Sequence, residues 1–251
     1  MLWRATASSR PPGITGHAVD LVRGAPDAGF GEHRRVQITP VSPDLLVEEV
    51  TGLVAARPGR VRLALDGPPP ARPVALAERV AVELRALGRA VLVVAAADFL
   101  RPASVRLEYG REDPDEFLDG WLDVGGLRRE VLDPAGPDGS GRVLPRLWDA
   151  AADRAYRDGY TELPADGVVL LAGALLLGRG LPLDMSVHLR MNPAALARTL
   201  PDDERWTLPA YARYDAEHDP ARAADLLVLV DHPDRPAIRR PERGDCGRGG
   251  S

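Results

Sequence analysis

The chain has 251 residues, and 45% of them are hydrophobic, which is enough to form the core of one large domain. Its net charge of -5 and pI near 5.6 argue against a nucleic-acid-binding protein, and no apolar run is long enough to span a membrane. The single cysteine, Cys246, excludes an internal disulfide and fits a reducing compartment, so a cytoplasmic protein is expected.

Composition divides the chain into three parts. Residues 1–36 are rich in Gly, Pro, Ser and Arg without a sustained periodicity, which predicts a disordered tail. Residues 37–240 carry the periodic apolar patterns of a folded domain. Residues 241–251 are rich in Gly and Arg, which predicts a mobile C-terminal tail.

Strands and helices alternate along the folded part. Ser42-Pro43 begins a helix that ends at Pro58, and a buried strand at 61–65 precedes a helix over 76–87. Further strands are predicted at 90–96, 168–171, 185–189 and 226–230, and further helices at 123–132, 193–200 and 207–217. This alternation is typical of an α/β fold with a mostly parallel sheet, and the strand at 61–65 is expected in its centre.

Several segments carry finer predictions. The continuous apolar run at 90–96 predicts a strand covered on both faces, and the strand at 226–230 is expected to be the last. The turn cluster at 136–142 predicts the tip of a hairpin. His188 lies in an apolar strand, which is typical of a core histidine with a hydrogen-bond partner rather than of a metal ligand.

The loop between the strand at 61–65 and the following helix lies where a phosphate-binding loop would lie. That loop has the pattern G-x-x-x-x-G-K-[ST], and its backbone N–H groups hold phosphate oxygens. Here Gly67 is kept, Pro73 replaces the lysine and Val74 replaces the magnesium-binding hydroxyl. The prolines of the loop have no N–H to donate, and the chain contains no lysine. Arg72 is a candidate phosphate ligand, although a solvated arginine is the simpler interpretation.

Other motifs extend over about residues 37–235 and together resemble the uridine kinase-like family of P-loop nucleoside kinases, especially its actinobacterial branch. They are Leu65-Asp66-Gly67-Pro68, Asp98-Phe99 with Arg101-Pro102, Gly110-Arg111, Leu127-Arg128-Arg129-Glu130, Leu132-Asp133-Pro134, and the closing Tyr214, Pro220, Ala224-Asp225 and Asp231. The resemblance implies a three-layer P-loop NTPase fold. In active members it also implies ATP and magnesium as cofactors.

The resemblance also implies roles for particular positions. The general base of the family corresponds to Ala97, which leaves the adjacent Asp98 as the only catalytic candidate, and the acid that assists magnesium corresponds to Ala172. The substrate side is expected at Asp98, Phe99, Arg101 and Tyr109. Arg198 and Arg205 correspond to the arginines of the family's lid.

The chain therefore lacks all four groups: the lysine and the hydroxyl of the loop, the general base, and the acid that assists magnesium. We expect a kinase-like protein without phosphoryl transfer and without a cofactor or metal, which binds a nucleoside-like molecule or a protein partner. One alternative is an active ATP-dependent uridine or cytidine kinase that uses Arg72 and Asp98, with ATP and magnesium. The other is a structural module that pairs with an intact paralogue.

Overall fold

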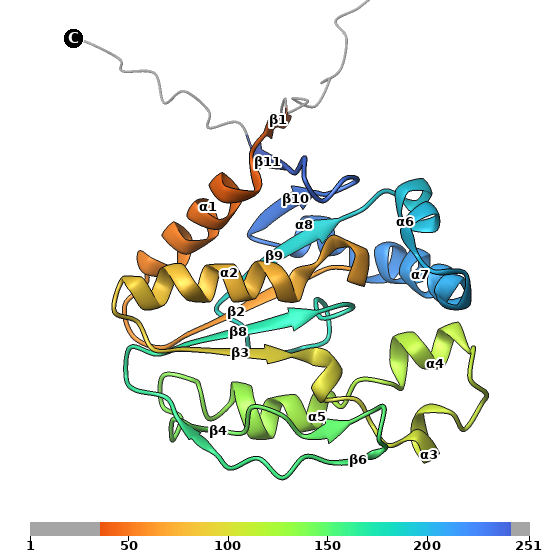
Figure 1. Cartoon of the computed structure of the whole chain (residues 1–251), viewed down its shortest axis with the longest axis horizontal. Helices are drawn as coiled ribbons and strands as arrows, with labels where there is room; N and C mark the ends of the chain where they lie inside the picture. The colour runs from red at the N-terminus through yellow and green to blue at the C-terminus, as the bar shows by residue number, and fades with distance from the viewer. Residues whose placement is uncertain (1–35, 242–251) are drawn as a thin grey trace, which may run out of the picture. The chain divides into compact units, whose positions relative to one another are not determined.

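A seven-stranded sheet runs through residues 36–241, the part of the chain that the computed structural model describes (Figure 1). Its strands lie in the order β1 (Val36–Pro40), β11 (Ala237–Pro241), β10 (Leu226–Leu229), β9 (Met185–Arg190), β2 (Val61–Asp66), β8 (Val168–Gly173) and β3 (Val91–Ala95). The predicted tails and Cys246 lie outside the described residues, except for Val36 and Pro241, which belong to β1 and β11 rather than to the tails.

The five strands from β10 to β3 are parallel, and β2 lies in the middle of them. Leu63 of β2 pairs with Leu170 of β8 on one side and with Met185 of β9 on the other. Because β2 is covered on both faces, Val61, Leu63 and Leu65 are all buried. The prediction of a mostly parallel sheet with this strand in its centre is confirmed.

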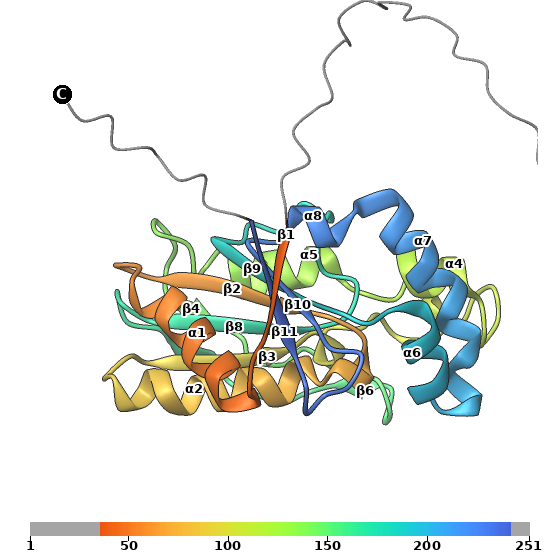
Figure 2. The same cartoon turned by 90° about the horizontal axis from the view of Figure 1, so that it is seen from above.

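Helices cover both faces of the sheet, as Figure 2 shows: α1 and α2 lie on one face, and α5 and α8 lie on the other. The side chains of Leu76, Val80 and Leu84 form the buried face of α2, which packs on β2, β8 and β3. The helices are α1 (Pro43–Ala55), α2 (Pro73–Ala86), α3 (Ala103–Arg106), α4 (Pro114–Asp119), α5 (Val124–Leu127), α6 (Pro193–Thr199), α7 (Leu208–His218) and α8 (Pro220–Ala223). Within 36–241, no helix is both long and apolar enough to cross a membrane.

Two predictions about strands are wrong. The strand β10 is not the last, because β11 follows it and pairs with both β10 and β1 in antiparallel fashion. The strand β3 is not covered completely, because it lies at the edge of the sheet, where only Val94 is fully buried.

The turn at 136–142 is not the tip of a hairpin. The short strand that follows it, β4 (Arg142–Val143), pairs with the distant β7 (Thr161–Glu162), while β5 (Trp148–Asp149) and β6 (Arg154–Ala155) form a separate pair. The Arg60 side chain fixes the turn, since it donates hydrogen bonds to the carbonyl oxygens of Gly139 at 2.8 Å and Leu163 at 3.1 Å. The turn therefore packs against the start of β2.

Candidate functional site

The loop after β2 joins the central strand of the sheet to α2. Residues 69–71 form one turn of 3-10 helix, and Arg72 then adopts a left-handed conformation, with φ 57° and ψ 50°, before α2 begins at Pro73. Gly67 lies directly against β9, where an added Cβ atom would be 2.8 Å from both the Cβ and the carbonyl oxygen of Leu189. Only glycine fits at this position without moving the loop.

The backbone N–H groups of this loop are already used or missing. The N–H of Gly67 donates to the oxygen of Gly173 at 2.9 Å, that of Ala71 donates to the oxygen of Pro68 at 2.8 Å, and that of Arg72 donates to the oxygen of Pro69 at 2.9 Å. The remaining positions of residues 67–73 are prolines. The first free amides lie farther on, at Val74 and Ala75 in the first turn of α2.

A cavity of about 360 Å³, here called the aromatic cavity, lies beside this loop at the carboxyl ends of β3 and β8. Its walls include Pro73 and Val74 of the loop and the two alanines, Ala97 and Ala172, which the sequence resemblance places at the positions of the family's acids. The structure therefore brings together the four predicted site positions that lack chemical groups. Arg72 lies at the edge of this cavity, is exposed and makes no side-chain hydrogen bond or ion pair within residues 36–241.

Aromatic side chains form the far wall of this cavity. Phe117 of α4 lies edge-on to Trp121, with ring centres 5.2 Å apart, and contacts Trp206 at 5.5 Å and Tyr211 at 6.0 Å in the same way. Arg106 stacks on Trp121 at 5.2 Å. Because each ring is held by its neighbours, the wall is rigid and offers an aromatic surface to a ligand.

Arg179 contributes a cation with few partners to the same cavity. Its Nε donates to the carbonyl oxygen of Leu175 at 2.6 Å, while Nη2 is buried without a partner among the described residues. Burial lowers the pKa of Arg179, and the nearby Asp119 opposes this shift without forming an ion pair with it. Asp119 pairs instead with Arg213 at 2.8 Å. A guanidinium has five donors, so most of those on Arg179 are unused.

The predicted substrate-side residues do not line the aromatic cavity. Phe99, which was expected on the substrate side, is fully buried in the core. Asp98 accepts a hydrogen bond from the Tyr156 hydroxyl at 3.1 Å, and burial raises its pKa. Arg101 is half-buried and Tyr109 is exposed. Leu100, Phe117 and Trp121 line the cavity instead.

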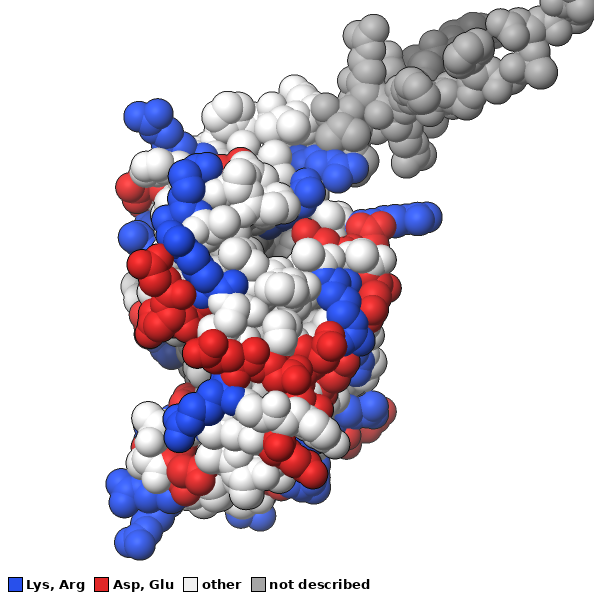
Figure 3. Space-filling view, turned by 90° about the vertical axis from the view of Figure 1, so that its right-hand side faces the viewer, with Lys and Arg blue, Asp and Glu red and all other residues white. Residues whose placement is uncertain are grey.

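The predicted lid arginines are exposed on α6 and in the turn after it. Arg205 pairs with Asp202 at 3.0 Å, and neither Arg198 nor Arg205 lines the aromatic cavity. Figure 3 looks onto the carboxyl ends of the parallel strands, and acidic side chains form a band across this face. The acids of α4 and α7 converge on one arginine, with Asp115, Asp119 and Glu217 all within 2.9 Å of Arg213.

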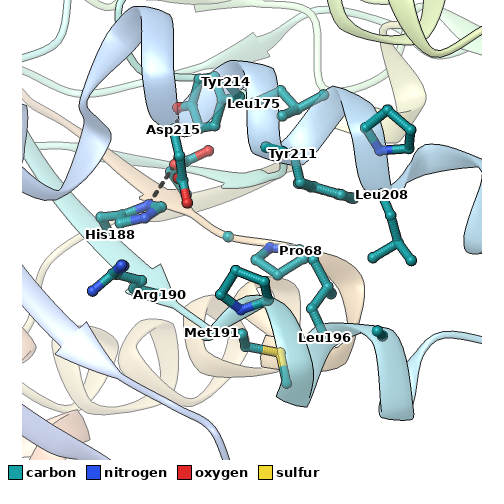
Figure 4. Close-up of a pocket in the computed structure, with 16 residues that line it drawn as sticks. Pro68, Leu175, His188, Arg190, Met191, Leu196, Leu208, Tyr211, Tyr214 and Asp215 are labelled. Carbon is teal, nitrogen blue, oxygen red and sulfur yellow. Dashed lines mark hydrogen bonds and ion pairs between the residues drawn. The ribbon is translucent and has the colours of Figure 1, made fainter.

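A second cavity, of about 420 Å³ and here called the β9 cavity, lies on the other side of Gly67, between the end of β9, α6 and α7 (Figure 4). At its base the buried carboxylate of Asp66 accepts hydrogen bonds from the N–H of Leu176 at 2.9 Å and the hydroxyl of Tyr214 at 3.0 Å. Nδ1 of His188 lies 2.7 Å from the same carboxylate. The expected partner of His188 is thus found, but the cavity itself was not predicted.

No group of three or more His, Cys, Asp and Glu side chains in residues 36–241 is arranged to hold a metal ion. The Asp66, His188 and Tyr214 cluster is therefore a hydrogen-bonded network. It ties the segment 174–177 and α7 to the end of β2.

Solved structures resemble this fold. A possible uridine kinase from Bacillus stearothermophilus superimposes with a TM-score of 0.60 at 19% sequence identity, over 72% of this chain and 96% of that one. A protein assigned as a fructose transport system kinase from Silicibacter sp. TM1040 gives a TM-score of 0.51 at 25% identity, over 73% of this chain and 92% of that one. The predicted three-layer P-loop kinase fold is confirmed. No family model and no curated protein matches the sequence.

Proposed function

We propose that this chain is a cytoplasmic, uridine kinase-like P-loop protein of the actinobacterial branch that has lost phosphoryl transfer and binds a nucleoside-like small molecule. One observation carries the proposal: no backbone N–H is free between residues 67 and 73. If the loop of such a fold cannot hold phosphates, the adjacent cavity is the place where a ligand can still bind.

Magnesium ATP does not fit the residues of the loop. Hydrogen bonds to charged groups contribute about 1.5–3 kcal/mol each, and a micromolar affinity corresponds to only about 8 kcal/mol in total. Losing several such donors therefore removes a useful affinity for the triphosphate. Neither a lysine nor a loop hydroxyl compensates, because Pro73 and Val74 occupy those positions. The acidic band on the same face adds a field that disfavours the approach of a polyphosphate.

The aromatic cavity fits a flat, polar molecule better than it fits a phosphate. Phe117 and Trp121 offer ring surfaces on which a base can stack, and stacking of this kind contributes about 1–3 kcal/mol. Arg179 supplies unused donors for the carbonyl or hydroxyl oxygens of a base or a sugar. These features support a nucleoside-like ligand over a simple structural module, whose cavities would be expected to lack free donors.

The proposal is tested by titrating the full chain with uridine, cytidine and their triphosphates while the melting temperature is followed. Ligand at a hundred times its dissociation constant stabilises the protein by about 2.7 kcal/mol. We expect a nucleoside to stabilise the protein at least as much as its triphosphate does. Trp121→Leu should abolish the stabilisation by the nucleoside. Trp148 lies outside the aromatic cavity, so Trp148→Leu should preserve this stabilisation.

Two results would replace the proposal with one of its alternatives. Magnesium-dependent phosphate transfer from ATP to uridine that Asp98→Ala abolishes would establish the active kinase. Absence of stabilisation by every nucleoside, together with a stable hetero-oligomer formed with an intact kinase paralogue, would establish the structural module.

A further inference from the structure

The β9 cavity has two ends of opposite character, as Figure 4 shows. Four side chains that can carry charge lie at one end, those of His188, Arg190 and Asp215 together with Asp66, which is bonded to His188. The other end is apolar and is formed by Met191, Leu196 and Leu208. The volume of about 420 Å³ is at the small end of the range for ligand pockets. A matching ligand has a compact polar head and a short apolar body.

The two outer charged side chains of the polar end, Arg190 and Asp215, form no ion pair with each other or with another side chain of residues 36–241. Arg190 follows His188 by two positions on β9, so both side chains point to the same face of the sheet. Neither the Arg190 guanidinium nor the Asp215 carboxylate makes a side-chain hydrogen bond or ion pair within residues 36–241. Burial raises the pKa of Asp215, and the nearby His188 and Arg190 oppose that shift. A cation and an anion thus lie near one another without pairing.

His188 adds a ring nitrogen with a fixed direction. Its Nδ1 lies 2.7 Å from the Asp66 carboxylate, so Nε2 is the ring nitrogen that is left for a ligand. Nε2 has no partner among the described residues, yet it is not one of the buried polar atoms that lack one, so it reaches the cavity. Asp66 is itself fixed by the N–H of Leu176 and the hydroxyl of Tyr214, which prevents the ring from turning.

We propose that the β9 cavity binds a small apolar α-amino acid, independently of the nucleoside-like ligand of the aromatic cavity. The ammonium group of the amino acid donates to Asp215, and Nε2 of His188 faces the same polar end. Its carboxylate accepts from Arg190, and its side chain lies among Met191, Leu196 and Leu208. A simple amine would leave Arg190 unmatched and a simple carboxylate would leave Asp215 unmatched, whereas a zwitterion matches both.

Calorimetric titration of the full chain with three probes of one carbon skeleton tests this. The probes are L-leucine, 4-methylpentanoate, which lacks the ammonium group, and 3-methylbutylamine, which lacks the carboxylate. We expect saturable binding of leucine and affinities at least about tenfold weaker for the other two, because each loses a charge-assisted contact. Arg190→Gln and Asp215→Asn should each weaken leucine binding at least about tenfold. Arg190→Gln should leave binding of the amine unchanged.

Matched controls separate this site from the surface and from the aromatic cavity. Arg198→Gln and Asp203→Asn remove exposed charges near the cavity but outside it, and should leave leucine binding unchanged. Trp121→Leu alters the aromatic cavity and should also leave leucine binding unchanged. Leucine binding can therefore be measured whether or not the protein binds a nucleoside. The proposal is overturned if leucine, isoleucine, methionine and phenylalanine all fail to bind. It is equally overturned if 4-methylpentanoate binds as tightly as leucine, or if Arg190→Gln and Asp215→Asn leave leucine affinity intact.

Discussion

Replacing Tyr214 with phenylalanine removes one hydroxyl from the buried network at the end of β2. This hydroxyl donates to the Asp66 carboxylate at 3.0 Å and accepts the N–H of Leu177 at 2.8 Å. Tyr214 is 3% exposed, so water cannot replace either partner. The substitution therefore leaves a buried N–H without an acceptor and a buried carboxylate with one donor fewer.

The expected loss follows from these two hydrogen bonds. A hydrogen bond to a charged group contributes about 1.5–3 kcal/mol and a neutral one contributes about 0.5–1.5 kcal/mol. We therefore expect Tyr214→Phe to lower the free energy of unfolding by about 2–4 kcal/mol. Unfolding in urea, followed by circular dichroism, measures this change directly, provided that the slope of the transition stays the same.

Tyr211 provides a matched control one turn earlier in α7. It is 9% exposed, but its hydroxyl has no hydrogen-bond partner in the described part of the chain. Tyr211→Phe removes no hydrogen bond and keeps the packed ring, so it should change the stability by less than about 0.5 kcal/mol. The reasoning would be refuted if both variants lost the same amount, or if Tyr214→Phe also stayed within that limit.

Two further predictions concern the packing of the loop and an ion pair beneath the sheet. Gly67→Ala should cost about 1–3 kcal/mol in chemical unfolding, because the new Cβ meets Leu189 at 2.8 Å, whereas Gly52→Ala has open space and should be neutral or stabilising. Burial alone would raise the pKa of Asp184, but three hydrogen bonds from Arg62 at 2.7–2.9 Å hold that pKa below its ordinary value. The stability that this carboxylate contributes is therefore present above about pH 4 and is lost as the pH falls through its folded-state pKa. Asp184→Asn should cost about 1–3 kcal/mol at pH 7, and unfolding at a series of pH values should show this difference shrinking below pH 4.

The parts of the fold that sequence could predict depend on local patterns. Leu76, Val80 and Leu84 repeat with the helical period, and all three are buried in α2. The lack of backbone N–H donors in the loop could also be predicted, because a proline has no N–H in any fold. By contrast, β11 has the sequence AIRRP and is a strand only because β1 and β10 pair with it on either side. Nothing local to that segment indicates a strand.

The candidate sites were less predictable, because their residues are far apart in the chain. Asp66 is 122 positions from His188 and 148 from Tyr214, so no spacing rule could bring the three together. Phe99 directly follows a 3-10 turn, and its ring is buried in the core rather than exposed to the aromatic cavity. Sequence placed the candidate site at the carboxyl ends of the parallel strands, but it did not show which neighbouring side chains line the cavity there.

Titration of the full chain with magnesium ATP, followed by calorimetry, tests the central claim that this loop no longer holds a triphosphate. Because no N–H is free between residues 67 and 73, we predict no saturable heat of binding up to about millimolar magnesium ATP. This corresponds to a binding free energy weaker than about 4 kcal/mol. Saturable micromolar binding that requires magnesium and disappears in Arg72→Ala would contradict the claim, since it would mean that the loop binds phosphate through its remaining arginine.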